Sequence, residues 1–480
     1  MELESSLTPA QARQEMLATS PVKRLLWKLT LPAMTGMLIM SLYNIVDTIY
    51  IGRGVGSIGI AGVTIAFPVM ILQMALGQMA GIGAASVISR NLGSGDIRRA
   101  ERTLGNAVAL SVGSGLIVTL VCLPNSAALL HLMGASDAVL PYAKDYLDVI
   151  LIGAVFGTYP MTMINLVRAE GNAKAAMNIM IFGAVLNIVL DPIFIFWLHM
   201  GVQGAAVATV IAHLATTIYV TRYFLSGQST LRLALPALNL ERSVVREIVA
   251  VGFPSFIRMG AMSFIVLIIN RTLGFYGGDL SIAAYGIVNR MMMFMAMPLM
   301  GIGQGLQPIL GFSYGAKQFG RSLEVTRYAL VVASVFSAAA FLVLFFLPEI
   351  VMRVFSDDAA LIAIGVHASK YVFVAFFVVG FQIVGSIVFQ ALGHVGRTFV
   401  TSISRQVLFL VPLLLVLPRF FEADGVWLAF PIADVASVLL VLFLMIPQLR
   451  EFKRLQDLQI AQATDPRMTV TSEVEVQTPA

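Results

Sequence analysis

The sequence predicts an all-α polytopic membrane protein, and two properties of the chain carry that prediction. First, 58% of its 480 residues are hydrophobic and only 12% are charged, whereas charged residues make up about 25% of an average soluble chain. Second, the apolar residues form about twelve stretches, each near the ~20 residues with which a helix crosses a bilayer. They lack the ~10-residue alternation of barrel strands, so we expect transmembrane helices.

Charged or Gly/Pro-rich loops separate the predicted spans, which follow one another with short connections. Their boundaries are set by the loops, because the apolar pattern itself fades gradually. In chain order the predicted helices cover residues 25–50, 58–88, 103–124, 139–166, 175–198, 202–225, 245–274, 281–310, 325–348, 360–391, 397–418 and 425–447.

The domain plan follows from these spans. Six helices form a first lobe over residues 21–226, and six more form a second lobe over residues 245–450. A cytoplasmic segment, 1–20, precedes them, and a cytoplasmic linker, 227–244, joins them. The tail, 451–480, is polar and low in aromatic residues, a composition typical of disorder.

The distribution of basic residues predicts the orientation in the membrane. If the N-terminus is cytoplasmic, the loops and helix ends on that side receive most of the lysines and arginines, including Arg98, Arg99, Arg102, Arg397 and Arg405. Cytoplasmic loops carry such an excess. We therefore expect a multi-pass protein of the cell (inner, cytoplasmic) membrane with both termini in the cytoplasm.

The two halves of the chain repeat one plan. A single constant shift, which we call the repeat offset, aligns Pro32 with Pro254 and keeps many later residues in register. Because six helices per half is an even number, both halves enter the membrane in the same direction and form parallel repeats. Two such lobes enclose a central cleft, an architecture typical of alternating access. Further matched residues are Gly52 with Gly274, Gly81 with Gly303, Gly83 with Gly305 and Gly93 with Gly315.

Several motifs resemble one transporter family. The first half has GxGAASxxxRNLGxGDxxxA from Gly81, VRAEGN at 167–172 and LNIVLDPIFIF at 186–196; the second has QGLQPILGFSYGA at 304–316 and QALGH at 390–394. Over roughly residues 20–450 the chain resembles the multidrug and toxic compound extrusion (MATE) transporters, closest to the bacterial and archaeal branch of DNA-damage-inducible F-like proteins. The resemblance implies a V-shaped, two-lobe transporter.

Two acidic residues of the first lobe, Asp47 in the first predicted helix and Asp191 in the fifth, bear the cost of a charge inside an apolar stretch. A charge at the bilayer centre costs about 2.5–3.5 kcal/mol on insertion scales, which suggests a function. Asn187 precedes Asp191 by one turn, so the two share a helix face, and Pro192 can kink the helix. Two such carboxylates can share a proton or bind a small cation. Alternatively, Asp47 reaches the outer interface and Asp191 begins a turn there.

The resemblance assigns roles to these residues. In similar transporters an acidic residue of helix one and an Asn/Asp pair of helix five form a cation-linked site, which implies Asp47, Asn187 and Asp191 here. A threonine of helix six and a tyrosine of helix four match Thr209 and Tyr146. The coupling ion is H⁺ or, at Asp47, Asn187, Asp191 and Thr209, Na⁺. Thr209 could instead bond to its own helix, and Tyr146 could belong to an interfacial aromatic belt.

The second lobe lacks acidic residues in the segments FPSFIRMGAMSFIVLIIN of helix seven and VFVAFFVVGFQIVGSIVFQALG of helix ten. Some MATE transporters carry a sodium site on these helices, so sodium coupling through this lobe is not expected. Its polar and methionine residues are instead candidates for the substrate cleft. Alternatively, the arginine among them extends its side chain to the membrane interface, and the remaining candidates serve ordinary packing. The candidates are Asn289, Arg290, Met292, Gln304 and Gln307.

These observations predict an antiporter that exports organic, often cationic, amphiphilic compounds. The absence of a GxxxxGK[ST] phosphate loop argues against ATP hydrolysis, and we expect no enzyme activity and no cofactor. Expected partners are small organic molecules and lipid, without nucleic acid, and the protein is expected to be a monomer. One alternative is a flippase for a lipid-linked precursor; another is a gated channel or membrane receptor.

Overall fold

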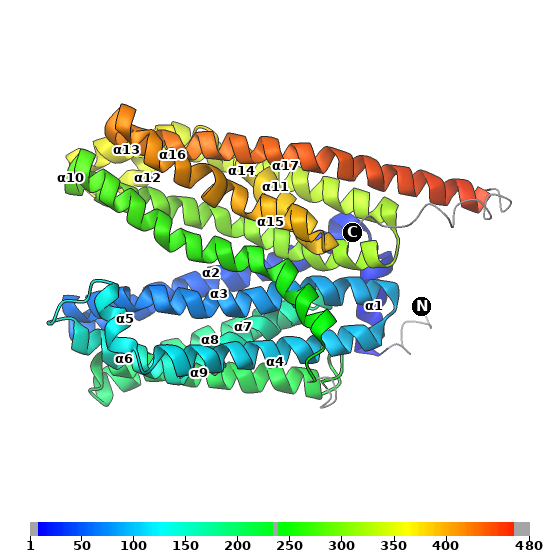
Figure 1. Ribbon diagram of the computed structural model, residues 1–480, viewed down its shortest axis with the longest axis horizontal. Coiled ribbons are helices and arrows are strands. Elements are labelled where there is room, and N and C mark those ends of the chain that lie inside the picture. The colour runs from blue at the N-terminus through cyan, green and yellow to red at the C-terminus, as the bar shows by residue number, and fades with distance from the viewer. Residues whose placement is uncertain (1–7, 234–238, 465–480) are drawn as a thin grey trace.

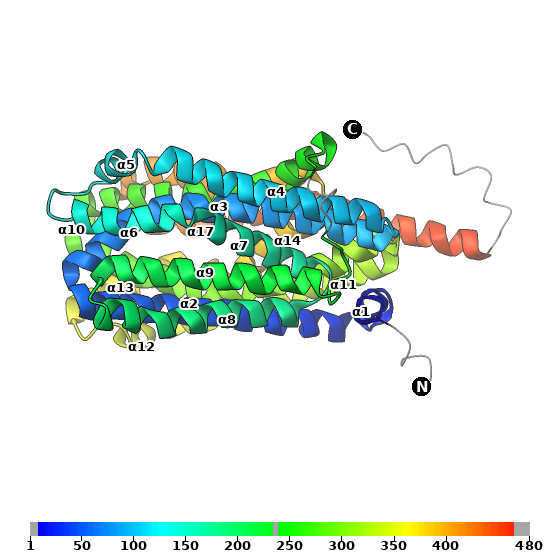
Figure 2. The ribbon, with the colours of Figure 1, turned by 90° about the horizontal axis from the view of Figure 1, so that it is seen from below.

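The computed structural model describes residues 8–233 and 239–464, and every regular element within them is a helix (Figure 1). The helices lie roughly parallel in two bundles. Figure 2 views the molecule from the side of the first bundle, whose helices lie in front of those of the second. This arrangement confirms the predicted all-α, two-lobe fold.

The first lobe contains six membrane spans and three shorter helices. One span is broken: its two parts meet at Gly153 with a bend of 57°. The helices are α1 (Pro9–Thr19), α2 (Val22–Val55), α3 (Ser57–Ser94), α4 (Ile97–Cys122), α5 (Ser126–Leu132), α6 (Leu140–Ile152), α7 (Ala154–Ala169), α8 (Ala173–Pro192), the π-helix η2 (Ile193–Trp197) and α9 (Gly201–Leu225).

The second lobe repeats this order after α9. A break at Ala375 bends one of its spans by 52°, and a left-handed turn at Gly278 divides its first long helix into two spans. The helices are α10 (Arg242–Gly315), α11 (Phe319–Phe346), α12 (Pro348–Arg353), α13 (Ala359–Phe373), α14 (Phe376–Leu392), α15 (Val395–Ile403), the π-helix η4 (Ser404–Leu410), α16 (Val411–Val416) and α17 (Pro418–Thr464).

The number of spans agrees with the prediction. Within the described residues nine helices are long and apolar enough to cross a membrane, and two bent pairs, α6 with α7 and α13 with α14, raise this number to 11. One of the nine is α10, whose 74 residues cross twice because the backbone turns at Gly278. The described residues therefore form twelve spans.

The internal repeat is visible in the backbone. Gly56, which joins α2 to α3, has φ +83°, and Gly278, its partner at the repeat offset, has φ +68°. This left-handed region favours glycine, because a side chain there is strained. The breaks at Gly153 and Ala375 are also equivalent under the same offset. Each lobe thus turns and bends at matching places.

The first described helix, α1, and the C-terminal part of α17 lie at the same end of the bundle (Figure 1). We call it the α1 end: it carries α1, the turns at 94–97, 169–173 and 392–395, and the C-terminal part of α17. The opposite end, with α5 and α12, is called the α5 end. In Figure 1 the two lobes meet toward the α1 end and diverge toward the α5 end.

Glycines join the lobes near the α1 end. A Cβ atom added to Gly93 would lie only 2.0 Å from the carbonyl oxygen of Phe312, and one added to Gly315 would lie 2.0 Å from that of Arg90. These two contacts are equivalent under the repeat. The backbones of α3 and α10 therefore approach as closely as small residues permit. We call this contact the lobe joint.

The C-terminal tail differs in part from the prediction. Helix α17 continues to Thr464, so the prediction of disorder from 451 is wrong for residues 451–464. Two causes are visible: the segment is rich in Leu, Gln, Arg and Lys, which favour helix, and Phe452 is fully buried against the ring of Tyr314. Residues 465–480 lie outside the described part of the chain.

Candidate cation site in the first lobe

Four spans of the first lobe bring the five predicted coupling residues together. Asp47 comes from α2, Tyr146 from α6, Asn187 and Asp191 from α8, and Thr209 from α9. All five side chains are buried. Asp47 lies in the second half of α2 and Asp191 precedes the last residue of α8, so the cluster lies in the half of the lobe nearer the α5 end. We call it the carboxylate cluster.

The two carboxylates of this cluster face each other. Asp47 and Asp191 lie close enough to interact directly, and the Asn187 Nδ2 donates a hydrogen bond of 2.9 Å to Asp191 Oδ1. The Asn187–Asp191 contact follows from their spacing of one helical turn. Asp47, which faces this pair, lies on α2, a helix far from α8 in the sequence.

Four oxygen atoms in the cluster are buried and have no hydrogen-bond partner among the described residues: Asp47 Oδ1, Asn187 Oδ1, Asp191 Oδ2 and Thr209 Oγ1. Most buried polar atoms in proteins are bonded, and each exception calls for an explanation. Carboxylate, amide and hydroxyl oxygens are the ligands that hard cations prefer. This donor set fits a proton shared by the carboxylates or a small cation such as Na⁺. Thr209 does not bond back to its own helix.

The helix geometry beside Asp191 is irregular. Pro192 ends α8, and the five-residue π-helix η2 follows directly. Proline cannot donate to the backbone ladder, and π-helical turns occur frequently at functional sites. The sequence LDPIF therefore places Asp191 at a point where the regular hydrogen bonding of the span is interrupted.

Tyr43 belongs to the cluster and was not predicted. It lies on α2, one turn before Asp47, where its hydroxyl faces Thr209 and both carboxylates. Tyr146 approaches the same group from α6, inside the lobe and away from its surface. The signal for Tyr43 was available in the sequence, since residues four apart share a helix face.

The five substrate-cleft candidates of the second lobe do not form one cluster. Gln307 lies at the lobe joint, where its Nε2 donates to the Ile82 carbonyl at 3.4 Å. The buried Oε1 of Gln304 has no partner among the described residues. Arg290 is exposed, and Asn289 beside it is half-buried. The Met292 sulfur lies 3.6 Å from Arg405 Nη2.

Arg405 corrects one sequence expectation. Its side chain does not belong to a cytoplasmic loop but lies in η4, inside the eleventh span, where Nε donates to Asp434 Oδ1 of α17. Asp434 was not predicted as a polar site. A lone arginine and a lone aspartate in neighbouring apolar spans each carry a cost in the membrane. This cost is the sequence observation that could have indicated a functional or structural role for the two residues.

A twelve-span membrane protein with two parallel repeats has the architecture of a secondary transporter. A family model named MatE matches residues 32–193 and 254–416 of the chain. The chain therefore belongs to the MatE family, which confirms the resemblance found in the motifs and makes the protein a transporter rather than an enzyme.

Known proteins of this family align along nearly the whole chain. The MATE multidrug transporter DinF-BH, solved in complex with a dye, is 44% identical, covers 88% of this chain and 95% of its own, and has a TM-score of 0.83. An outward-facing MATE transporter of the MOP superfamily is 26% identical over 92% of this chain and 98% of its own, with a TM-score of 0.85. The multidrug export protein MepA of Staphylococcus aureus (strain N315) is 27% identical over 429 residues, which is 89% of this chain and 94% of MepA.

Proposed function

We propose that the chain is an antiporter that exports organic, often cationic, amphiphilic compounds in exchange for H⁺ or Na⁺. The observation that carries the proposal is the carboxylate cluster, with its four buried oxygens that lack a partner among the described residues. The multidrug relatives, among them the transporter solved with a bound dye, support the class of substrate.

The cluster suggests how ion and substrate exclude each other. When a proton or Na⁺ neutralises Asp47 and Asp191, the first lobe loses its attraction for a cationic substrate. By linkage, substrate and ion then weaken each other's binding to the same extent. An inward-moving proton gains about 2.3 kcal/mol per 100 mV of membrane potential, which can drive export.

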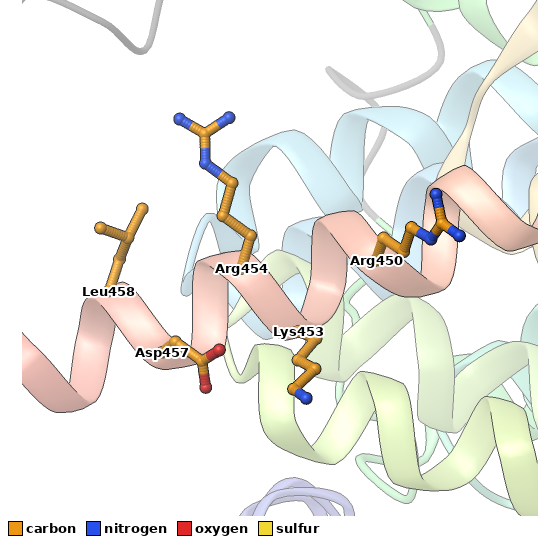
Figure 3. A pocket seen from close by; sticks show the side chains of 5 residues that line it. All are labelled: Arg450, Lys453, Arg454, Asp457 and Leu458. Carbon is orange, nitrogen blue, oxygen red and sulfur yellow. The ribbon is translucent and has the colours of Figure 1, made fainter.

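The lobe joint suggests which state the structure represents. Basic residues extend along α17 at the α1 end, where Arg450, Lys453 and Arg454 line a shallow surface hollow (Figure 3). An excess of such residues supports a cytoplasmic position for this end. With the α1 end in the cytoplasm, lobes joined there correspond to an outward-facing state. Alternating access requires this joint to open.

The deciding experiment is dye efflux in inverted vesicles with the pH gradient and the sodium gradient imposed separately. Wild type should accumulate a fluorescent cationic dye under one of these gradients. Asp47→Asn should abolish this transport while membrane insertion stays normal, because one carboxylate of the coupling pair is lost. Asp145→Asn removes an exposed carboxylate next to Tyr146 and should transport like wild type.

Full ion-driven transport by Asp47→Asn contradicts the proposal. Conductance that persists without counter-transport of dye supports the channel alternative. Movement of a lipid-linked precursor without dye transport supports a flippase.

A further inference from the structure

A buried ion pair lies inside the second lobe, away from the carboxylate cluster. Arg405 of η4 and Asp434 of α17 form it through Nε and Oδ1. The Asp434 side chain is 2% exposed and that of Arg405 is 19% exposed. Both residues lie in apolar spans, Val395–Val416 and Pro418–Gln462. Charges in such places are rare and pair with one another.

Comparing the two lobes at the repeat offset shows that the first lobe lacks this ion pair. At the repeat offset, Arg405 corresponds to Gly183 and Asp434 to Ala212, so the first lobe has no charge at either position. Conversely, the second lobe has Ile269 in place of Asp47 and Leu413 in place of Asp191. Each lobe carries its acidic group where the other is apolar, but only the second lobe supplies a permanent cation with it.

Arg405 is the charged group that balances Asp434. The other groups that contact the pair are neutral. Met292 of α10 places its sulfur 3.6 Å from Arg405 Nη2, and Ser437, on α17 itself, donates its hydroxyl to the Asp434 backbone carbonyl at 2.9 Å. Among the described residues, no second charged side chain faces Asp434. The carboxylate therefore depends on this guanidinium, which stays protonated at any physiological pH.

We propose that Arg405 is a built-in counter-cation that keeps Asp434 ionised throughout the transport cycle, so that the second lobe takes up no coupling ion. The number of ions exchanged per substrate is then set by the carboxylate cluster alone. In the first lobe the positive charge that balances the carboxylates is an ion from solution, which binds and is released. In the second lobe that positive charge is the Arg405 side chain. This inference rests on the proposed antiport, and it makes Arg405 the residue that restricts ion coupling to one lobe.

The direct test is the neutral double variant Arg405→Met/Asp434→Asn. Removing both partners of a buried ion pair is far milder than removing one, because no uncompensated charge remains. In proteoliposomes this variant should export dye with the same number of ions per dye molecule as wild type, measured from the ion gradient that just balances a known dye gradient. A lower number of ions per dye molecule in a folded double variant overturns the inference.

A second test removes the positive charge that balances Asp434. In an Asp47→Asn background, which silences the first lobe, Arg405→Met leaves Asp434 without its counter-charge. The midpoint of thermal unfolding in detergent should then rise more steeply with proton or Na⁺ concentration than it does in Asp47→Asn alone, because a group that binds only the folded state stabilises it. Adding Asp434→Asn should return the slope to that of Asp47→Asn, and Arg405→Lys in the same background should leave the slope unchanged.

The outcomes separate this inference from the proposed function. If wild type shows no ion-driven transport, the antiport proposal itself fails. If wild type couples normally but, in the Asp47→Asn background, Arg405→Met shows the same ion dependence of unfolding as Arg405→Met/Asp434→Asn, only the role of Arg405 is wrong.

Discussion

At the scale of single residues, the first lobe concentrates its chemistry in a few side chains that different helices bring together. Asn187 orients Asp191 through one hydrogen bond, while Asp47 approaches from α2. Tyr43 adds a hydroxyl that faces the same group. Four buried oxygens of the cluster have no hydrogen-bond partner among the described residues, which is why the proposed ion site is placed there.

Tyr43→Phe tests the contribution of the hydroxyl. If the hydroxyl supplies one hydrogen bond to the ion-loaded cluster, it contributes about 0.5–1.5 kcal/mol, and the variant should need roughly two- to tenfold more of the coupling ion for half-maximal dye transport. Tyr50→Phe is the matched control, because Tyr50 lies two turns further along α2 and packs edge-on against Phe196. Equal ion requirements in both variants would show that the Tyr43 hydroxyl plays no part.

Individual residues also show which parts of the two charged sites could be predicted from the sequence. Asp47 and Asp191 could be predicted because a charge in an apolar span is costly, and Asn187 because residues four apart share a face. The Arg405–Asp434 pair could not be predicted in the same way. Its members are 29 residues apart on separate spans, and no local pattern indicates which side chain of one helix meets which side chain of the next.

At the scale of helices and their connections, two devices hold elements in place near the α1 end. The lobe joint packs the glycines of α3 against α10. Separately, Glu170, between α7 and α8, accepts hydrogen bonds from Ser229 Oγ at 2.9 Å and the Thr230 amide at 2.6 Å, in the segment after α9. The repeat offset predicted matching glycines, but their contact became visible only in the fold.

Gly93→Ala should force the joint apart, because the added methyl group would lie 2.0 Å from the Phe312 carbonyl oxygen. Overpacking of this kind costs about 1–3 kcal/mol, and the midpoint of thermal unfolding should fall accordingly. Gly113→Ala in α4 is the control, since a Cβ there meets nothing within 4 Å. A Gly93→Ala protein as stable as Gly113→Ala contradicts the close approach.

Glu170 should make stability depend on pH. Burial raises the pKa of its carboxyl above the ordinary value, although the amide of Thr230, Arg13 nearby and the Ser229 hydroxyl act in the opposite direction. The folded protein thus binds this proton more tightly than the unfolded chain. The free energy of unfolding should therefore fall as pH rises through the raised pKa.

Glu170→Gln should flatten that part of the pH profile, measured as the midpoint of thermal unfolding from acidic to neutral pH. Glu15→Gln, an exposed change on α1, should leave the profile as in wild type. An unchanged slope in Glu170→Gln assigns the pH dependence to other groups.

At the scale of the whole molecule, the two lobes share packing but not charge. The glycine contacts of the lobe joint are equivalent under the repeat, whereas the ion pairs across it are one-sided. Glu247 of α10 accepts hydrogen bonds from Arg90 and Arg99 of the first lobe, each at 2.9 Å. Its equivalent at the repeat offset is the apolar Leu25. One carboxylate thus holds two arginines of the opposite lobe.

Glu247→Gln should shift the lobes toward a state that is open at the α1 end. Hydrogen bonds to charged groups contribute about 1.5–3 kcal/mol each, so the ratio of open to closed molecules should rise roughly tenfold or more. Spin labels at Arg98 and Arg454, in a chain with Cys122→Ser, would report longer distances. Labels at Ser136 and Asp357 would follow the α5 end in the same samples.

Glu241→Gln is the matched control for this experiment. It breaks a longer and more exposed pair with Arg102, at 3.5 Å, and exposed pairs contribute little. If Glu241→Gln and Glu247→Gln shift the distances equally, the shorter and less exposed ion pairs of Glu247 have no special effect.

The matching breaks at Gly153 and Ala375 separate the shape of a lobe from its chemistry. Neither residue is a proline, and the two differ in type, yet the spans bend by 57° and 52° at equivalent places. The bend therefore belongs to the packing plan that both lobes share and not to one residue type. On that shared plan one lobe carries Asp47 and Asp191 and the other carries Arg405 and Asp434. Two identical subunits could not divide their charges in this way.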